Sequence, residues 1–256
     1  MTSRPIELSV IVPAFNEARR VGSFLTDAIE YLDATMPDAW ELIVVDDGSA
    51  DGTADVINRL AEDQPRLRLL RHPVNIGKGA AVRTGVAASG GRRVLFADAD
   101  GATPMAEERR LRRVIDAGAD AAIGSRQARQ MIGAPAGLGE ADDPVVRTVH
   151  WHRFLIGRTF AFLVNRALGL RYLDTQCGFK MFRRDVAVVL FSQLTQLRYI
   201  FDAELLYLAD RRSFHVVEVP VNWHDVAGSK VRLMRDSGLM FVGMWKIRLA
   251  HRSSHR

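Results

Sequence analysis

The first 125 residues alternate short apolar runs, rich in β-branched side chains, with amphipathic stretches of helical period. The apolar runs are nearly continuous, which is typical of strands covered by helices on both faces. Five such runs lie at residues 8–12, 42–45, 67–70, 94–97 and 121–123. The helical stretches between them lie at residues 17–32, 53–61, 78–88 and 106–117. This alternation predicts an α/β fold with a mostly parallel central sheet flanked by helices, in which ligands bind beyond the carboxyl ends of the strands.

The pattern changes after Arg126, where residues 127–143 are rich in Gly, Ala and Pro and predict a loop. The remainder is predicted to begin with a long helix at residues 145–170 and a turn at 174–179. Two helices at 185–191 and 201–209, a strand at 216–219 and an amphipathic helix at 237–250 are predicted to follow. The regular alternation of the first half therefore does not continue into the second.

The chain has 256 residues, 48% of them hydrophobic and 25% charged, which is the composition of a globular protein with a full core. A membrane-spanning helix needs about 20 largely apolar residues. The best candidate, residues 154–170, is interrupted by Arg158 and Arg166, so we expect no spanning helix. The first residues lack the regions of a secretory signal, and a single cysteine, Cys177, cannot form an internal disulfide. These features predict a protein of the reducing cytoplasm.

The charge is distributed unevenly along the chain. Residues 1–145 carry a formal net charge of −5, whereas residues 146–256 carry +10. Such asymmetry predicts that the second half meets an anionic partner, for example a membrane surface, a phosphorylated substrate or nucleic acid. Ordinary surface charge is the alternative interpretation.

Two carboxylates, Asp98 and Asp100, stand at the end of the apolar run at residues 94–97. Moving a charge out of water costs several kcal/mol unless another charge or a metal pairs with it. The pair therefore predicts a divalent cation, with water and substrate phosphate as its other ligands. An Asp-x-Asp pair also occurs in turns and helix caps, so its meaning depends on the neighbouring strand ends.

Polar residues also follow the first two predicted strands. Asp46 closes the second strand, and Pro13, Phe15 and Glu17 close the first. Because parallel strands bring their carboxyl ends to one edge, we expect these residues to share a site with Asp98. Asp46 could accept the imino proton of uracil, and Pro13 and Phe15 could contact the base. Glu17 could bind a sugar hydroxyl or cap its helix.

A lysine flanked by glycines, at residues 77–79, stands at the start of a predicted helix. Backbone N–H groups at a helix N-terminus, together with the ammonium group of Lys78, attract phosphate. The segment is neither a Walker motif nor a dinucleotide fingerprint, and a plain turn is the alternative interpretation.

Taken together, Val12–Glu17, Val45–Ser49, Gly77–Gly79 and Asp98–Asp100 resemble the motifs of glycosyltransferase family 2 in their order and spacing. The resemblance covers nearly the whole chain and implies the GT-A fold, in which a nucleotide-sugar and a metal bind at this edge of the sheet. It implies a Mg²⁺ or Mn²⁺ ion held by Asp98 and Asp100. It also implies a UDP-sugar donor bound by Pro13, Ala14, Phe15, Glu17, Asp46, Lys78, Asp98 and Ala99.

Further segments resemble the dolichyl-phosphate glucosyltransferases of that family, namely Asp98–Thr103, Gly124–Arg126, Asp174–Lys180 and Phe201–Leu206. This resemblance implies an inverting, metal-dependent transfer of a hexose, with glucose from UDP-glucose expected, to a polyprenyl or dolichyl phosphate. Ala102 departs from the mannosyl relatives, in which a glutamine at this place helps to hold the metal. We expect water or another group to take the place of that glutamine as a metal ligand.

The acceptor phosphate is expected to meet arginines of the second half. Arg126 and Arg153 carry planar guanidinium groups suited to bidentate phosphate binding. The resemblance implies that these two residues, with Ser125, hold the lipid phosphate. Asp202 would be the base for a hydroxyl acceptor, and for a phosphate acceptor it could orient the sugar or an arginine. A solvated surface position is the alternative for either arginine.

The resemblance also implies a lid at Gly228, Ser229 and Lys230 that closes over the diphosphate. Lys230 would then offset charge on the leaving group. Accordingly, we divide the chain into a nucleotide-sugar-binding half at residues 1–126, an acceptor-binding half with mobile loops at 127–235, and a basic amphipathic helix and tail at 236–256. The last part could lie on an anionic membrane. A helix packed in the core is the alternative.

These expectations describe a cytoplasmic enzyme that is peripheral at the inner face of a membrane and has no nucleic-acid partner, with a homo-oligomeric state left open. The first rival is the same fold acting on a soluble phosphorylated or saccharide acceptor. The second is a phosphohydrolase whose aspartyl motif is Asp98–Asp100, although that motif usually follows the first strand of its fold. The third is a basic, non-enzymatic module that binds membrane or nucleic acid, which would leave the acidic strand ends unexplained.

Overall fold

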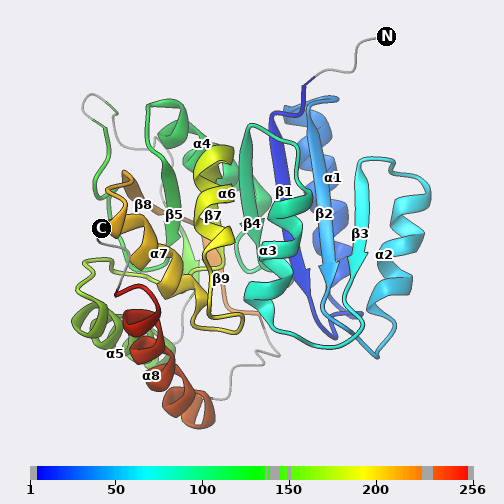
Figure 1. Cartoon of the computed structure of the whole chain (residues 1–256). Helices are drawn as coiled ribbons and strands as arrows, with labels where there is room; N and C mark the ends of the chain where they lie inside the picture. The colour runs from blue at the N-terminus through cyan, green and yellow to red at the C-terminus, as the bar shows by residue number, and fades with distance from the viewer. Residues whose placement is uncertain (1–4, 136–137, 139–144, 149–150, 227–232, 253–256) are drawn as a thin grey trace.

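The computed structural model describes residues 5–135, 138, 145–148, 151–226 and 233–252. In this part of the chain a seven-stranded sheet has the order β3-β2-β1-β4-β7-β5-β8 (Figure 1). Its strands are β1 Leu8–Ala14, β2 Trp40–Asp46, β3 Leu67–Arg71, β4 Arg93–Ala97, β5 Ala121–Ser125, β7 Phe179–Arg183 and β8 Val216–Pro220. β7 is antiparallel to its neighbours β4 and β5, and every other neighbouring pair is parallel. The parallel strands therefore end on one edge of the sheet, as expected.

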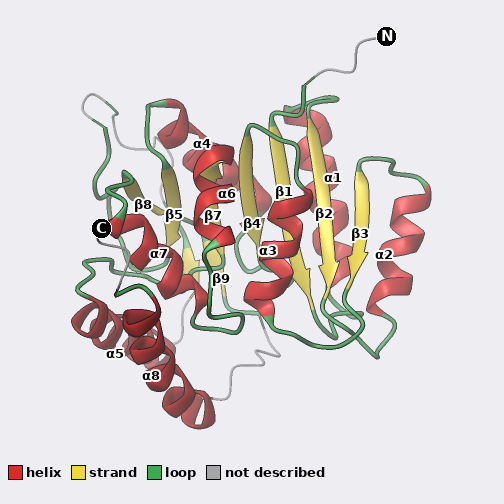
Figure 2. Ribbon diagram, viewed as in Figure 1, coloured by secondary structure: helices red, strands yellow, loops and turns green. Residues whose placement is uncertain are grey.

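Helices cover both faces of the sheet (Figure 2). On one face the core includes Phe24, Ile57 and Leu111, contributed by α1 Val21–Thr35, α2 Thr53–Glu62 and α4 Glu108–Asp116. On the other face it includes Val82, Leu190 and Phe201, contributed by α3 Lys78–Ala88, α6 Arg184–Ser192 and α7 Phe201–Arg211. Because both faces are covered, the residues of β2 are all buried, which explains why its sequence shows no polar alternation.

Two further helices, α5 Trp151–Leu168 and α8 Leu233–Ala250, pack together and against α7 through a core that contains Val164, Leu206 and Ile247. Figure 1 shows them beside the edge at which the parallel strands end. Within the described ranges, no helix is long and apolar enough to cross a membrane. Two short strands, β6 Arg147–Thr148 and β9 Trp223–His224, form a separate parallel pair, and a 3-10 turn, Met105–Glu107, precedes α4.

The α/β prediction with a mostly parallel sheet is confirmed, and the five strands predicted in the first half are present with slightly longer bounds. Strand β7 was not predicted, because Phe179 was interpreted as the end of a turn and residues 180–183 were assigned to no element. Its partners are distant in sequence, with Phe179 opposite Ala97 and Lys180 opposite both Phe96 and Ile123. An antiparallel strand inserted between β4 and β5 has no local signal that distinguishes it from a loop.

Three predicted helix starts were wrong, and one of them, that of the helix predicted from residue 237, lies earlier at Leu233. The helix predicted from residue 17 begins at Val21, because Asn16 adopts a φ of 52° and the Glu17 carbonyl accepts bonds from the backbone N–H groups of Arg20 and Val21 in a turn. The helix predicted from residue 145 begins at Trp151, because Arg147 and Thr148 pair with β9 instead. The proposed division at residue 126 separates binding roles rather than folding units, since β7 and β8 complete the same sheet as β1 to β5.

Candidate active site

Asp98 and Asp100 follow β4 at the carboxyl edge of the sheet. The backbone N–H of Asp98 donates to the carbonyl of Gly178 at 3.0 Å, which ties the end of β4 to the turn before β7. A Cβ atom at Gly178 would lie 2.0 Å from Oδ2 of Asp98, so only glycine permits this approach. Asp100 Oδ1 accepts a bond from the backbone N–H of Ala102 at 3.1 Å. Burial, and next the charge of Asp98, raise the pKa of Asp100.

Lys78 stands at the first position of α3 and points at the same carboxylates. Its Nζ lies 2.5 Å from Oδ1 of Asp98. Burial by itself acts to lower the pKa of Lys78, but the charges of Asp98 and Asp202 outweigh it and raise that pKa above its ordinary value. The residue therefore stays a cation throughout the physiological range, as a partner for phosphate must.

The loop that presents Lys78 is held by Asp47. Oδ1 of Asp47 accepts the backbone N–H of Ile76 at 3.0 Å, and Oδ2 accepts the backbone N–H of Gly77 at 2.8 Å. Gly77 has a φ of 129°, which a residue with a side chain rarely adopts. The second aspartate of the Asp46–Asp47 pair thus has a structural role that the sequence did not reveal.

Asp46 is fully buried at the end of β2. Its Oδ1 accepts the backbone N–H of Ser49 at 2.9 Å. Its Oδ2 lies 3.0 Å from Nε of Arg71, yet it accepts no hydrogen bond from the described residues, so this ion pair lacks hydrogen-bond geometry. A buried carboxylate oxygen without a donor is the kind of acceptor that the predicted contact with a uracil imino group requires.

The end of β1 lies beside that of β2, since Pro13 pairs with Val45 and Ala14 with Asp46. The carbonyl of Ala14 accepts the backbone N–H of Asp47 at 2.8 Å, and the ring of Phe15 is partly exposed. The structure therefore brings Pro13, Ala14 and Phe15 to the predicted edge.

The carboxylate of Glu17 is engaged by Arg20, whose Nε donates to Oε2 at 2.8 Å. No side chain caps α1, so the capping alternative for Glu17 was wrong. Arg20 was not predicted. Its charge acts to lower the pKa of Asp100, which places it near the carboxylate pair.

A buried ion pair lies deeper in the site. Lys180 of β7 is fully buried, and its Nζ donates to Oδ1 of Asp202 at 2.5 Å and to the carbonyl of Cys177 at 2.7 Å. Asp202 lies in the first turn of α7, and its charge contributes to the raised pKa of Lys78. Sequence reasoning gave Lys180 no role, although a lysine inside the apolar run at residues 179–182 is a signal for a buried charge.

Arg126 follows β5 and forms a bidentate pair with Asp174. Its Nε and Nη2 donate to the two carboxylate oxygens at 2.7 and 2.8 Å, and its backbone N–H donates at 2.9 Å. Burial alone would raise the pKa of Asp174, but Arg126 outweighs it and lowers that pKa. The guanidinium of Arg126 also lies over the ring of Trp223, 5.8 Å from its centroid. Asp174 thus orients the arginine, whose Nη1 has no hydrogen-bond partner among the described residues.

Ser125 is fully buried, and its hydroxyl accepts the backbone N–H of Ala128 at 3.0 Å. Arg153 lies on the first turn of α5, and the direction of its side chain is outside the described residues, as are Gly228, Ser229 and Lys230. The acceptor and lid roles of these residues therefore stay predictions.

The residues present fit a divalent cation in part. Among the described residues, no group of three or more His, Cys, Asp and Glu side chains is arranged to hold a metal. Burial and then the charge of Asp98 raise the pKa of Asp100, and a cation beside the two carboxylates would favour the ionised form of Asp100. Mg²⁺ prefers a site in which two protein carboxylates are completed by oxygens of water and phosphate.

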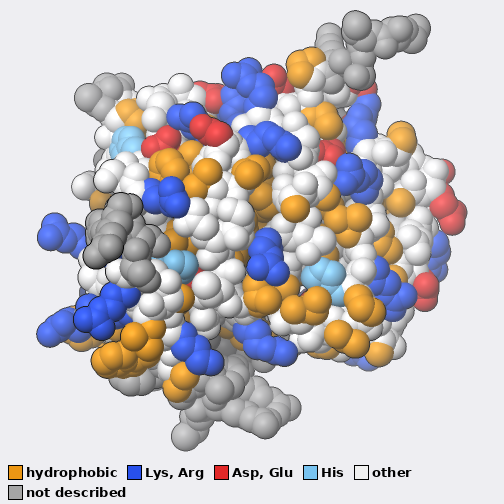
Figure 3. All heavy atoms as spheres, viewed as in Figure 1, with side chains coloured by type: hydrophobic (Ala, Val, Ile, Leu, Met, Phe, Trp, Pro, Cys, Tyr) orange, Lys and Arg blue, Asp and Glu red, His pale blue; other side chains and the backbone are white. Residues whose placement is uncertain are grey.

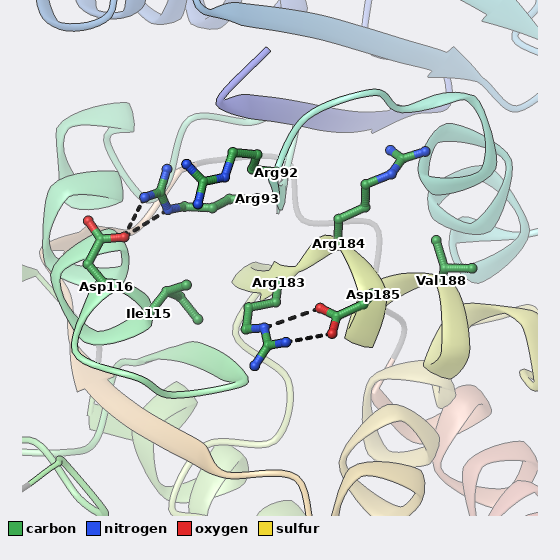
Figure 4. Close-up of a pocket in the computed structure, with 8 residues that line it drawn as sticks. All are labelled: Arg92, Arg93, Ile115, Asp116, Arg183, Arg184, Asp185 and Val188. Atoms are coloured by element: carbon green, nitrogen blue, oxygen red, sulfur yellow. Dashed lines mark hydrogen bonds and ion pairs between the residues drawn. The ribbon is translucent and has the colours of Figure 1, made fainter. Parts of the chain in front are cut away.

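A separate hollow of about 720 Å³ opens at the other edge of the sheet (Figure 4). Two of its four arginines are paired with its two aspartates. Arg93 contacts Asp116 at 2.5 Å, and Arg183 contacts Asp185 at 2.6 Å. Because its two aspartates are taken up by these pairs and it lies away from the carboxyl ends of the strands, we assign the candidate site to the carboxyl edge instead.

Comparison with known proteins identifies the family. Residues 9–191 match the family described as Glycosyl transferase family 2. The chain belongs to this family. The resemblance drawn from the sequence is thereby confirmed, and the protein is a glycosyltransferase rather than a phosphohydrolase or a non-enzymatic module.

Relatives in the family extend over most of the chain. The dolichyl-phosphate beta-glucosyltransferase of Saccharomyces cerevisiae is 35% identical over 258 residues, which cover 96% of this chain and 75% of the relative. The protein of the same name from Homo sapiens is 36% identical over 258 residues, which cover 94% and 78%.

Solved structures show the same fold. Glucosyl-3-phosphoglycerate synthase from Mycobacterium tuberculosis, in complex with Mn²⁺, UDP-glucose and phosphoglyceric acid, aligns with a TM-score of 0.64 at 22% identity, over 96% of this chain and 79% of that chain. A mannosyltransferase from Pyrobaculum calidifontis, in complex with GDP-Man and Mn²⁺, aligns with a TM-score of 0.58 at 20% identity, over 90% and 59%. The predicted GT-A fold is confirmed.

Proposed function

We propose that this glycosyltransferase moves glucose from UDP-glucose to a polyprenyl phosphate, with inversion at the anomeric carbon. The observation that carries the proposal is the convergence of Lys78, Asp98, Asp100 and Asp202 at the carboxyl edge of the sheet, in a chain whose relatives are named dolichyl-phosphate beta-glucosyltransferases. These groups supply an acidic site for a cation and an adjacent ammonium group for phosphate.

The donor would lie across the ends of β1, β2 and β4. Oδ2 of Asp46 would accept the imino proton of uracil, while Pro13, Ala14 and Phe15 contact the base. Lys78 would exchange its contact with Asp98 for the donor diphosphate, because an ammonium at a helix N-terminus attracts phosphate. In this arrangement Ala99 and Glu17 line the path between the base and the sugar.

Asp98 and Asp100 would hold the Mg²⁺ or Mn²⁺ ion. When bound, the ion supplies Lewis-acid stabilisation of the negative charge that develops on the departing diphosphate. The chain's own contribution is to hold the two carboxylates in place, through the close approach of Gly178 to Asp98 and the backbone bond from Ala102 to Asp100. Lys78 adds a second positive charge beside the leaving group.

The nucleophile would be an oxygen of the acceptor phosphate. A phosphate monoester has a second pKa of about 6 and is already an anion at neutral pH, so it needs no general base. The contacts of Asp202 support this, since Lys180 neutralises its carboxylate at 2.5 Å. Arg126, oriented by Asp174, would direct the phosphate at the anomeric carbon, together with Ser125, Arg153 and the lid residues Gly228, Ser229 and Lys230.

We also propose that an anionic membrane presents the acceptor to the surface formed by α5 and α8. Apolar side chains are exposed there, with Phe162 at 66%, Trp245 at 60% and Leu249 at 58%. They stand among exposed cations, namely Arg158, Arg166, Lys246 and Arg248. Figure 3 shows the apolar and basic side chains side by side on these helices. The described side chains of α5 and α8 include no carboxylate, which suits a surface that meets anionic headgroups.

The test is to incubate the protein with UDP-glucose, GDP-mannose or UDP-N-acetylglucosamine, each with Mg²⁺ or Mn²⁺, and to analyse the products by mass. Each donor is offered both a polyprenyl phosphate and a soluble phosphorylated acceptor. A glucosyl lipid phosphate that forms only from UDP-glucose supports the proposal. Transfer to the soluble acceptor but not to the lipid would replace it with the rival of a soluble substrate.

Membrane association is tested separately by co-sedimentation with vesicles. We expect binding to vesicles that contain phosphatidylserine and little binding to neutral phosphatidylcholine, because the exposed cations of α5 and α8 require anionic headgroups. Trp245→Ala should weaken the binding, whereas Arg252→Ala, at the end of the helix, serves as the control for a general loss of charge. Equal sedimentation with neutral vesicles would contradict the electrostatic argument.

A further inference from the structure

A buried pair, Glu204 and His251, joins the end of the C-terminal helix α8 to helix α7. His251 follows α8 and is 7% exposed, and Glu204 of α7 is fully buried. Nε2 of His251 lies 2.7 Å from Oε1 of Glu204. Because a carboxylate only accepts, Nε2 carries the proton and donates this bond. Glu204 is two residues from Asp202, so the same turn of α7 carries one residue of the candidate site and one residue that contacts the segment after α8.

The same carboxylate holds the segment that connects α6 to α7. The backbone N–H of Thr195 donates to Oε1 at 3.0 Å, and its hydroxyl donates to the same atom at 2.6 Å. The backbone N–H of Gln196 donates to Oε2 at 2.7 Å. The positions of residues 195–197 therefore depend on where His251 and α7 place the carboxylate of Glu204.

That segment packs directly against the loop that carries Lys78. The carbonyl of Leu197 accepts the backbone N–H of Ala80, in the first turn of α3, at 3.2 Å. A Cβ atom at Gly77 would lie 2.3 Å from this carbonyl oxygen, and one at Gly79 would lie 2.8 Å from the side chain of Phe201. Neither glycine has room for a side chain, so the segment lies directly against the backbone on either side of Lys78 and a displacement of the segment is transmitted to it.

We propose that His251 is a positioning residue, which acts through Glu204 and residues 195–197 to hold the Lys78 loop in place for the donor diphosphate. Donor binding thereby depends on how α8 packs against α7. The proposal rests on the proposed function, because it takes Lys78 to bind the donor. Since α8 also carries Trp245 and Leu249 on its exposed side, contact with lipid and binding of the donor would act on the same helix.

The test compares two amides at this position, measured by calorimetric titration of UDP in the presence of Mn²⁺. His251→Gln places an amide nitrogen where Nε2 stands, so it can still donate to Glu204. His251→Asn is equally polar but too short to reach. We expect the Asn variant, and likewise His251→Ala, to bind UDP about fivefold more weakly or worse, with a raised KM for UDP-glucose and an unchanged KM for the acceptor. The Gln variant should restore most of the affinity, and Arg252→Ala should match the wild type.

The outcomes separate the two proposals. If the wild type binds no UDP, the proposed function fails. If the wild type binds UDP and the Asn and Gln variants match it, only the positioning role of His251 is overturned, even if their unfolding temperatures fall. A merely structural histidine would lower thermal stability in both amide variants without separating their affinities for UDP. The Asn and Gln comparison decides the matter even if the Ala variant does not fold.

Discussion

Charged residues lie at both edges of the central sheet, but the two edges differ in how completely these charges are paired. At the amino edge, Arg93 and Arg183 each meet two carboxylates, with Glu7 and Asp116 around the first and Asp120 and Asp185 around the second. At the carboxyl edge, Asp100 makes no ion pair with any described residue, and both burial and Asp98 raise its pKa. In the hollow at the amino edge both aspartates pair with arginines, whereas Asp100 at the carboxyl edge has no such partner among the described residues. Unbalanced charge, rather than the size of a hollow, marks the site.

The largest expected effect concerns the buried pair at the carboxyl edge. Lys180→Met keeps the volume of the side chain but leaves Asp202 buried without its cation, which should lower the free energy of unfolding by about 3–5 kcal/mol. Arg183→Met, in the hollow, removes a half-exposed cation and should cost about 1 kcal/mol or less. Urea unfolding of both variants measures the difference, and equal losses would remove the contrast between the edges.

Asp100→Asn should separate activity from stability. We expect turnover to fall by about 100- to 1,000-fold, because the variant loses one of the two carboxylates for the cation. Its thermal unfolding temperature should stay the same or rise, since the charge it removes is disfavoured by burial. Asp116→Asn at the amino edge is the matched control and should keep its activity. Full turnover in Asp100→Asn would refute the assignment of Asp100 to the cation.

Gly178→Ala tests the contact between the β7 turn and Asp98. The new methyl group would collide with the carboxylate, so we expect destabilisation of about 1–3 kcal/mol. Displacement of Asp98 should also lower kcat by about 10- to 100-fold. Gly90→Ala, whose Cβ would meet Ile6 and Glu41 at ordinary distances of 3.4 and 3.5 Å, is the control. An active, stable Gly178→Ala protein would show that Asp98 need not keep its place.

The smallest effect is a pH dependence of the metal-free protein. A carboxyl group whose pKa is raised by folding contributes stability at low pH that is lost as the pH rises through the folded-state pKa. The stability of Asp100→Asn relative to the wild type should therefore increase from pH 4 upward and level off above the raised pKa. Addition of Mn²⁺ should stabilise only the wild type. Parallel pH profiles of the two proteins would contradict the raised pKa of Asp100.

Much of the site could be predicted because its carboxylates follow buried strands directly. Asp46, Asp98 and Lys78 stand at element boundaries that the apolar pattern locates within about two residues. The partners that control them could not be found in this way. Lys180, Asp174 and Gly178 come from the second half, and their contacts join residues about 20 to 80 positions apart.

By itself, the sequence determined the α/β class and the family, because hydrophobic period and short motifs are local properties. Only the tertiary structure decided the antiparallel insertion of β7, the pairing of Arg126 with Asp174 and the neutralisation of Asp202 by Lys180. These depend on which distant side chains share a buried volume. Electrostatic energies there vary steeply with distance and burial, and neither quantity can be read from one linear chain.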